Sequence, residues 1–224
     1  MNSGESILAR IREALAGAPS TSPHTHERPT PNVGASPRAW LPRVGETEAE
    51  RLSLFIKNAS DLKAVVHVQP RNEALNVLQQ LKATEGWRKV ATHRTTLASE
   101  FAAALKLPTL HTDDGYSPGD LESCDVAITG CDALVAQTGS VLVTSPSAGC
   151  RALSVLPEHH IVVATKDQLL PDLPAAFELL KRKYSDNYPS FISFITGPSR
   201  TGDIERILVL GAHGPKKLTI LCLS

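Results

Sequence analysis

Two glycine-containing turns near the end of the chain carry residue types that suit anion binding and proton transfer. The first turn spans residues 197–203 with the sequence GPSRTGD, and the second spans residues 211–217 with the sequence GAHGPKK. Such turns expose backbone N–H groups, and their glycines let a ligand approach the backbone closely. Gly-Pro turns are structural far more often than functional, but the crowding of charged residues in this segment favours a site built on strand ends.

The first turn supplies candidates for holding a carboxylate or a phosphate. Ser199 and Thr201 offer hydroxyl groups, and Arg200 offers a guanidinium that can bind a carboxylate through two hydrogen bonds. Lys216 in the second turn is a further cation. We therefore expect an anionic ligand at these turns.

Three residues of the same segment are candidates for catalysis. Asp203 and Glu205 lie two residues apart, so both would point to one face of an extended chain. They suit acid–base chemistry, or they simply pair with a neighbouring arginine. His213 lies between two glycines, and its imidazole titrates near neutral pH. No catalytic role follows from the residues alone.

A second polar turn lies earlier, at Gln137-Thr138-Gly139-Ser140. Its hydroxyls and backbone amides suit a carboxylate or phosphate, although a plain β-turn with glycine at a positive φ is the commoner meaning of this pattern. Arg151 follows a Ser/Gly-rich loop and could bind a carboxylate, although a surface ion pair is its commoner use. We expect Gly139 and Arg200 to share one pocket, with arginine at its wall.

The cysteines argue against metal chemistry in this chain. Cys124, Cys131, Cys150 and Cys222 form no C-x-x-C pair, and their spacing matches no zinc or iron–sulfur pattern. We expect reduced, mostly buried thiols and no bound metal, with Cys150 the only one suspected of reactivity. His24 and His26 resemble a metal pair, but they lie in a segment without apolar periodicity.

Alternating strand and helix patterns must position these residues. We expect helices at 46–58, from Pro70 onward, at 96–105 and at 171–184, the last with Phe177 facing inward. Expected strands are 64–68, 89–92, 125–129, 133–136, 141–144, 161–164, 191–196, 207–210 and 218–223, and residues 145–151 form a loop. The early alternation predicts a parallel α/β sheet, and the closely spaced middle strands predict some antiparallel pairing.

Composition excludes several classes of function. The chain has 224 residues, a formal net charge of zero and 4% aromatic residues, which disfavours nucleic-acid binding. No apolar run approaches the roughly 20 residues that span a bilayer, and the N-terminus lacks a secretory pattern, so we expect a cytoplasmic protein. Residues 1–45 are expected to form a helix and a Pro-rich linker, and residues 46–224 one domain.

Three segments carry a family resemblance. DVAITGCDALVAQTGSVLV, RALSVLPEHHIVV and ITGPSRTGDIERILVLGAHGPKKL, in this order, resemble the LUD domain of the lactate-utilisation protein C family, from about Asp61 to Ser224. The resemblance implies an α/β fold like that of sugar isomerases and CoA transferases, an open, mixed, largely parallel sheet flanked by helices. It also implies two iron–sulfur partner proteins that act with the chain in oxidising L-lactate to pyruvate. The clusters would then belong to the partners, and this chain would bind no cofactor.

One departure from the family bears on mechanism. The family commonly has glutamate where this chain has Gln137, and an amide cannot serve as a carboxylate nucleophile or base. The leading hypothesis is an accessory or substrate-handling subunit of lactate oxidation. The alternatives are a separate isomerase or transferase acting on a phosphosugar or an acyl-CoA, and a non-catalytic interaction module that docks through its N-terminal helix or forms homo-oligomers.

Overall fold

A computed structural model describes residues 7, 9–10, 12–13, 41–201, 209–211 and 213–224. The chain divides into two units, Met1–Trp40 and Leu41–Ser224, and the second, called the folded unit below, contains the sheets. The described residues of the N-terminal unit are helical, as the sequence pattern predicts, whereas His24 and His26 lie outside the described residues. Among the helices that the structure describes, none is long and apolar enough to cross a membrane.

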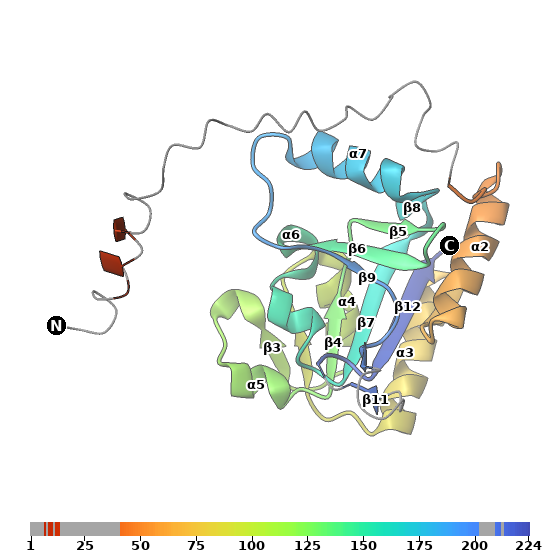
Figure 1. Cartoon of the computed structure of the whole chain (residues 1–224). Coiled ribbons are helices and arrows are strands. Elements are labelled where there is room, and N and C mark those ends of the chain that lie inside the picture. Colours follow the sequence, from red (N-terminus) through yellow and green to blue (C-terminus); the bar gives the residue numbers. More distant parts are fainter. Residues whose placement is uncertain (1–6, 8, 11, 14–40, 202–208, 212) are drawn as a thin grey trace. The chain divides into compact units, whose positions relative to one another are not determined.

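A six-stranded parallel sheet forms the centre of the folded unit (Figure 1). Its order is β1 (Val65–Gln69), β12 (Lys217–Leu223), β7 (His159–Thr165), β4 (Val126–Thr129), β2 (Val90–Thr92) and β3 (Thr109–His111). Strands β4, β7 and β12 are buried almost throughout, as expected for a parallel sheet covered on both faces. The strand–helix alternation in the sequence therefore predicted the central sheet correctly.

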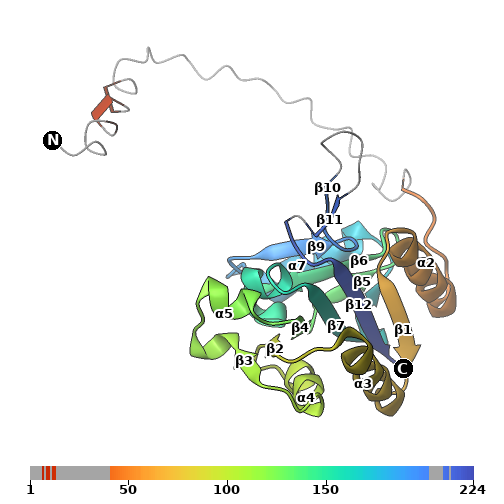
Figure 2. The same cartoon turned by 90° about the horizontal axis from the view of Figure 1, so that it is seen from below.

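Helices cover one face of this sheet, as seen from below (Figure 2). Helix α3 (Arg71–Glu85) begins after Pro70 and ends at Gly86, whose φ of 69° closes the helix in the left-handed conformation. Helix α4 (Thr96–Ala104) follows β2 on this face, whereas α5 (Pro118–Glu122) follows β3 and packs its Leu121 on Ala91 and Ala127, which face the opposite side. Leu78 of α3 and Phe101 of α4 pack against Ile161 and Val163 of β7. These residues form the first core layer.

The opposite face packs on a second sheet and on helix α2 (Glu48–Asp61), which a capping box of Thr47 and Glu50 starts. The second sheet has the order β8 (Leu169–Leu170), β5 (Ala133–Val135), β6 (Ser140–Thr144) and β9 (Ile192–Ile195). Strands β5, β6 and β9 pair antiparallel, which confirms the mixed character expected for this stretch. Along β7, Val162 and Ala164 alternate with Ile161 and Val163 of the first core layer, so their side chains face the second sheet and α2.

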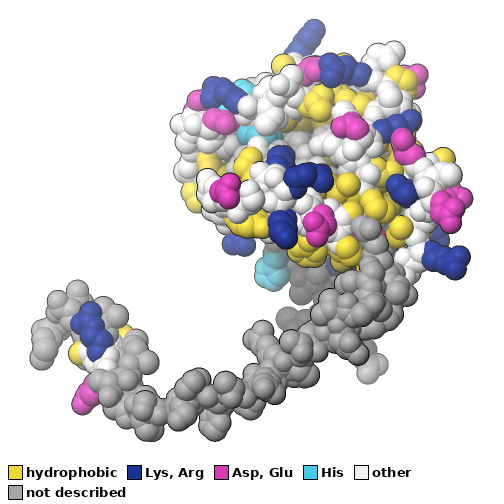
Figure 3. Space-filling model, turned by 90° about the horizontal axis from the view of Figure 1, so that it is seen from above, with side chains coloured by type: hydrophobic (Ala, Val, Ile, Leu, Met, Phe, Trp, Pro, Cys, Tyr) yellow, Lys and Arg dark blue, Asp and Glu magenta, His cyan; other side chains and the backbone are white. Residues whose placement is uncertain are grey.

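Helix α7 (Leu173–Tyr184) covers the outer face of the second sheet (Figure 1). Its buried residues are Ala176 and Leu180, whereas Phe177 is 58% exposed, so the expectation that Phe177 faces inward was wrong. Strand β9 is only half-buried because it lies at the end of its sheet. Figure 3, which looks onto the α7 side, shows apolar side chains among the charged ones on this surface.

Short elements complete the unit. Strands β10 (Arg200–Thr201) and β11 (Val209–Leu210) form a small antiparallel pair. The segment expected to be a loop at 145–151 contains a helical turn, α6 (Ser145–Ala148), and three-residue or four-residue 3₁₀ turns occur at Thr112–Asp114, Arg151–Ser154 and Lys166–Gln168. Helix α6 follows β6 directly, which brings its polar residues to the carboxyl ends of the central strands.

Candidate functional site

Two adjoining hollows lie at the carboxyl ends of the central strands, the edge at which open α/β sheets bind ligands. The first hollow, of about 260 Å³, has walls that include His93, Arg94, Thr112, Gly149 and Cys150. The second, of about 330 Å³, has walls that include Thr96, Leu97, Gly130, Gln168 and Lys183. Thr95 and Pro146 line both hollows. We call the two together the carboxyl-edge groove.

His93 is a buried histidine in the first hollow, and it directly follows β2. The residue is 3% exposed, and neither ring nitrogen has a hydrogen-bond partner of normal geometry in the part of the chain that is described. Burial lowers the pKa of His93, while the Asp113 carboxylate and the Ser147 backbone act in the opposite direction. The ring is therefore neutral at pH 7, with one donor and one acceptor nitrogen.

Gly149 keeps the first hollow open next to this ring. A side-chain carbon at Gly149 would come within 2.8 Å of the His93 Cβ, and the glycine has a φ of +75°. Both the space and the backbone conformation therefore require a residue without a side chain here.

The N-terminus of α4 borders the second hollow. Thr95 is its N-cap residue, but its side chain makes no capping hydrogen bond, and its Oγ1 is buried without a partner among the described residues. The first backbone N–H groups of an α-helix have no acceptor inside the helix, and the helix dipole favours an anion near them. Thr96 and Leu97 line the hollow, so an anion bound there would lie beside the start of α4.

Lys183 supplies a fixed cation to the second hollow. Its Nζ lies 2.5 Å from Oδ1 of Asp132, whose side chain is fully buried, while the lysine side chain is 49% exposed. The same carboxylate accepts hydrogen bonds from the Tyr184 hydroxyl at 2.8 Å and the Thr144 hydroxyl at 2.7 Å. Burial works against ionisation of Asp132, but these bonds outweigh it and lower its pKa. Asp132 is therefore charged and holds the lysine in place.

The groove thus has two chemically different ends. One combines a tethered ammonium group with the amides at the start of α4, and the other presents a neutral imidazole. This arrangement can hold a small anion and orient it through hydrogen bonds. No group of three or more histidine, cysteine or acidic residues suited to a metal ion occurs in the described ranges.

The structure places the polar turns predicted from sequence beside one another, away from this groove. Ser199 donates its backbone N–H to Pro215 O at 2.9 Å and accepts from the Gly211 N–H at 2.9 Å, so the two glycine-containing turns touch. The Thr138–Ser140 turn joins β5 to β6, and its Ser140 hydroxyl lies 2.8 Å from the Thr196 hydroxyl. These three segments therefore form one connected layer of turns.

Close backbone packing explains the glycines of these turns. A side-chain carbon at Gly139 would come within 2.4 Å of the Ala59 backbone nitrogen in α2. One at Gly197 would come within 2.4 Å of the Leu62 carbonyl oxygen, just after α2. Both glycines allow the chain to pack on the end of α2, which is a structural use.

Two predicted arginines, Arg151 and Arg200, lie at the surface. Arg151 is exposed, with its guanidinium 5.5 Å from the centre of the Phe191 ring, and Arg200 is exposed in β10. Thr201 pairs with Val209 through the backbone. Asp203 and Glu205 lie outside the described residues. The prediction of one pocket shared by Gly139 and Arg200 remains untested.

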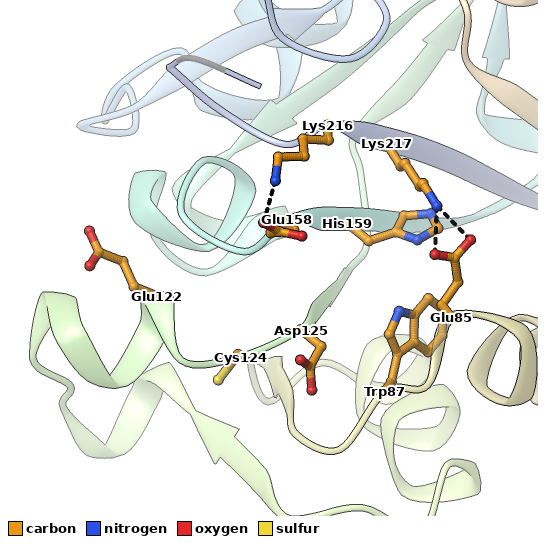
Figure 4. A pocket seen from close by; sticks show the side chains of 9 residues that line it. All are labelled: Glu85, Trp87, Glu122, Cys124, Asp125, Glu158, His159, Lys216 and Lys217. Atoms are coloured by element: carbon orange, nitrogen blue, oxygen red, sulfur yellow. Dashed lines mark hydrogen bonds and ion pairs between the residues drawn. The ribbon is translucent and has the colours of Figure 1, made fainter. Parts of the chain in front are cut away.

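His213 and Lys216 lie at the opposite, amino ends of the central strands. His213 is exposed and lines a hollow together with Lys216. In the neighbouring pocket of Figure 4, Lys216 pairs with Glu158 at 2.5 Å and Lys217 pairs with Glu85 at 2.5 Å. Each of these lysines has a carboxylate partner, as Lys183 has, but Glu158 and Glu85 are 68% and 26% exposed, whereas Asp132 is fully buried, so Lys216 and Lys217 are less firmly held than Lys183.

The sequence contained a signal for part of the groove. His93 directly follows a predicted strand, and Asp132 lies three residues after another, which places both at the carboxyl ends of a parallel sheet. Lys183 carried no such signal, because it reaches the groove from α7 on a different sheet.

Comparisons with known proteins agree with the fold. A family model described as the LUD domain matches residues 52–223. "Lactate utilization protein C" of Bacillus licheniformis is 35% identical over 98 residues, covering 43% of this chain and 41% of that protein. The protein of the same name from Halalkalibacterium halodurans is 37% identical over 107 residues, covering 47% and 46%. The matched stretches thus span less than half of these relatives' length.

A solved structure shares the architecture. The crystal structure of a DUF162 family protein from Deinococcus radiodurans superposes with a TM-score of 0.63 at 20% sequence identity, covering 80% of this chain and all of that one. At this identity the likeness shows the fold, and the chemistry must be argued from the groove.

Proposed function

The chain belongs to the LUD-domain family, and we propose that it is a substrate-handling subunit of lactate utilisation that binds a small carboxylate in the carboxyl-edge groove. The relatives named lactate utilization protein C support the biological role. The groove supports the binding role, because its second hollow combines a cation with helix N-terminal amides.

The single observation that carries the binding proposal is the Asp132–Lys183 pair. A lysine fixed by a buried carboxylate loses little further freedom when a ligand binds, so less conformational entropy opposes association. A hydrogen bond to a charged group contributes about 1.5–3 kcal/mol. Lys183 and the α4 amides are therefore enough to hold a ligand as small as lactate at modest affinity.

Electron transfer is assigned to partners. Oxidation of L-lactate to pyruvate removes two electrons and two protons, so an acceptor is required. In our proposal, iron–sulfur proteins take the electrons, and this chain presents the substrate without a cofactor of its own. Its cysteines are free, with Cys150 half-buried and the other three buried.

Gln137 gives no support to the alternative of a transferase that works through that position. Its side-chain Oε1 accepts the Leu173 N–H at 3.4 Å at the start of α7, and Asn58 donates to its backbone oxygen at 3.0 Å. The Oε1 is thus used at a helix start, while the Nε2 is buried without a partner among the described residues.

A titration followed by calorimetry tests the proposal with L-lactate, pyruvate and inorganic phosphate. We expect both carboxylates to bind the wild-type chain and Lys183→Met to weaken them at least tenfold. Lys181→Met, which removes an exposed lysine from the same helix, is the matched control and should bind as the wild type does. Absence of binding in folded wild-type protein, or full binding by Lys183→Met, would refute the assignment.

A further inference from the structure

We propose that the carboxyl-edge groove takes a polyhydroxylated carboxylate longer than lactate, with its carboxylate at Lys183 and a hydroxyl group at His93. This inference rests on the proposed function for the carboxylate end and adds a second subsite to it. Lactate alone would occupy the Lys183 end and leave the His93 hollow empty.

The size of the groove is the first argument. The hollows measure about 260 Å³ and 330 Å³ and meet at Thr95 and Pro146. Pockets for drug-sized ligands measure roughly 300–1,000 Å³, so the joined groove falls in the range of molecules much larger than a three-carbon acid. A ligand that fills it passes between the start of α4 and the turn at Ser145–Pro146.

Unpaired polar atoms at the far end are the second argument. Neither ring nitrogen of His93 has a hydrogen-bond partner of normal geometry, although the Ser147 backbone acts on the ring, and the Oγ1 of Thr95, where the two hollows meet, is buried without a partner in the described structure. A buried polar group left unpaired costs about 1–3 kcal/mol, so natural proteins rarely keep several together without a use. A ligand hydroxyl can both donate to and accept from an imidazole, which satisfies this end.

The charges of the first hollow select an uncharged group over a second anion. Arg94 forms an ion pair with Asp114, and its backbone N–H donates to Asp113 Oδ2 at 2.8 Å. The Asp113 carboxylate lines the hollow and repels another anion there, while the neutral His93 offers no compensating charge. A dicarboxylate or a bisphosphate is therefore a poorer fit than a hydroxy acid.

The test compares three probes on the full chain by calorimetry: L-lactate, D-gluconate and hexanoate, the last matching gluconate in carbon number but without hydroxyls. We expect wild-type protein to bind gluconate at least tenfold more tightly than hexanoate. His93→Phe keeps a ring of similar shape without nitrogens and should bring this ratio close to one. Lys183→Met should weaken all three probes.

A second variant keeps the test decisive if His93→Phe does not fold. Thr95→Val removes the unpaired hydroxyl at constant shape, and α4 loses no capping hydrogen bond. The ratio of gluconate affinity to hexanoate affinity should therefore fall about threefold or more in folded protein. If lactate binds through Lys183 but gluconate gains nothing over hexanoate, the extended site is wrong and the proposed function stands. If no probe binds, both are wrong.

Discussion

The two ends of the central sheet use their polar and charged residues differently. At the amino ends, Lys216 and Lys217 pair with Glu158 and Glu85 (Figure 4), and Asp125 accepts the backbone N–H groups of Arg88 and Lys89 at 2.7 and 2.9 Å. At the carboxyl ends, His93 and Thr95 have buried polar atoms without partners. At the amino ends, His159 and His160 each bond a threonine through Nε2 and leave only Nδ1 unpaired, so the proposed site differs in that both ring nitrogens of His93 lack a partner of normal geometry.

The largest expected effect concerns Asp132, which holds the carboxyl-edge groove together. Asp132→Ala should lower the free energy of unfolding by about 3–5 kcal/mol, because Lys183, Tyr184 and Thr144 lose their shared acceptor. Urea denaturation measures this. Glu158→Ala at the amino ends breaks an exposed pair and should cost less than about 1 kcal/mol. Equal losses in the two variants would erase the distinction between the ends.

Acid should destabilise the fold through histidines at the amino ends. Burial lowers the pKa of His159 to about 4 and that of His160 to about 3, from an ordinary value of 6.5. Below pH 6.5 the unfolded chain therefore binds more protons than the folded chain does. The free energy of unfolding falls as the pH drops from 6.5 toward 4, by at most about 1.4 kcal/mol per pH unit for each histidine. His160→Gln should flatten the slope measured by urea denaturation at several pH values. An unchanged slope would contradict the assignment.

A smaller effect is expected for the amides at the start of α4. Thr96→Pro removes one N–H at the first helical position, where proline is tolerated, and Thr95 already has the extended conformation that precedes proline. Lactate affinity should fall about tenfold, in line with one charge-assisted hydrogen bond. Thr96→Ala, which keeps the N–H, is the calorimetric control. Equal affinities in both variants would remove the helix terminus from the site.

The smallest effect is expected at the amino-end pocket itself. Lys216→Met breaks the exposed pair with Glu158 and should leave lactate affinity within about twofold of wild type, because Lys216 lies at the amino ends of the strands, outside the carboxyl-edge groove. A tenfold loss in calorimetry would move the anion site to the glycine-containing turns.

Most of the fold followed from sequence patterns, because continuous apolar strands alternate with amphipathic helices. The pattern failed for Phe177, which is exposed because α7 buries small residues such as Ala176 instead. The choice of site residues from sequence also favoured charged residues in turns, such as Arg200 and Lys216, over residues that directly follow a strand. Lys183 is held in the groove by Asp132, and pairing between residues so distant in the sequence cannot be read from local spacing.

The central claim is that the carboxyl-edge groove is the ligand site, and amide chemical-shift mapping by NMR tests it most directly. On titration with L-lactate, the account predicts the largest shifts at Thr96, Leu97 and Gly130. Shifts concentrated at Gly211, Gly214 and Lys217 instead would contradict it.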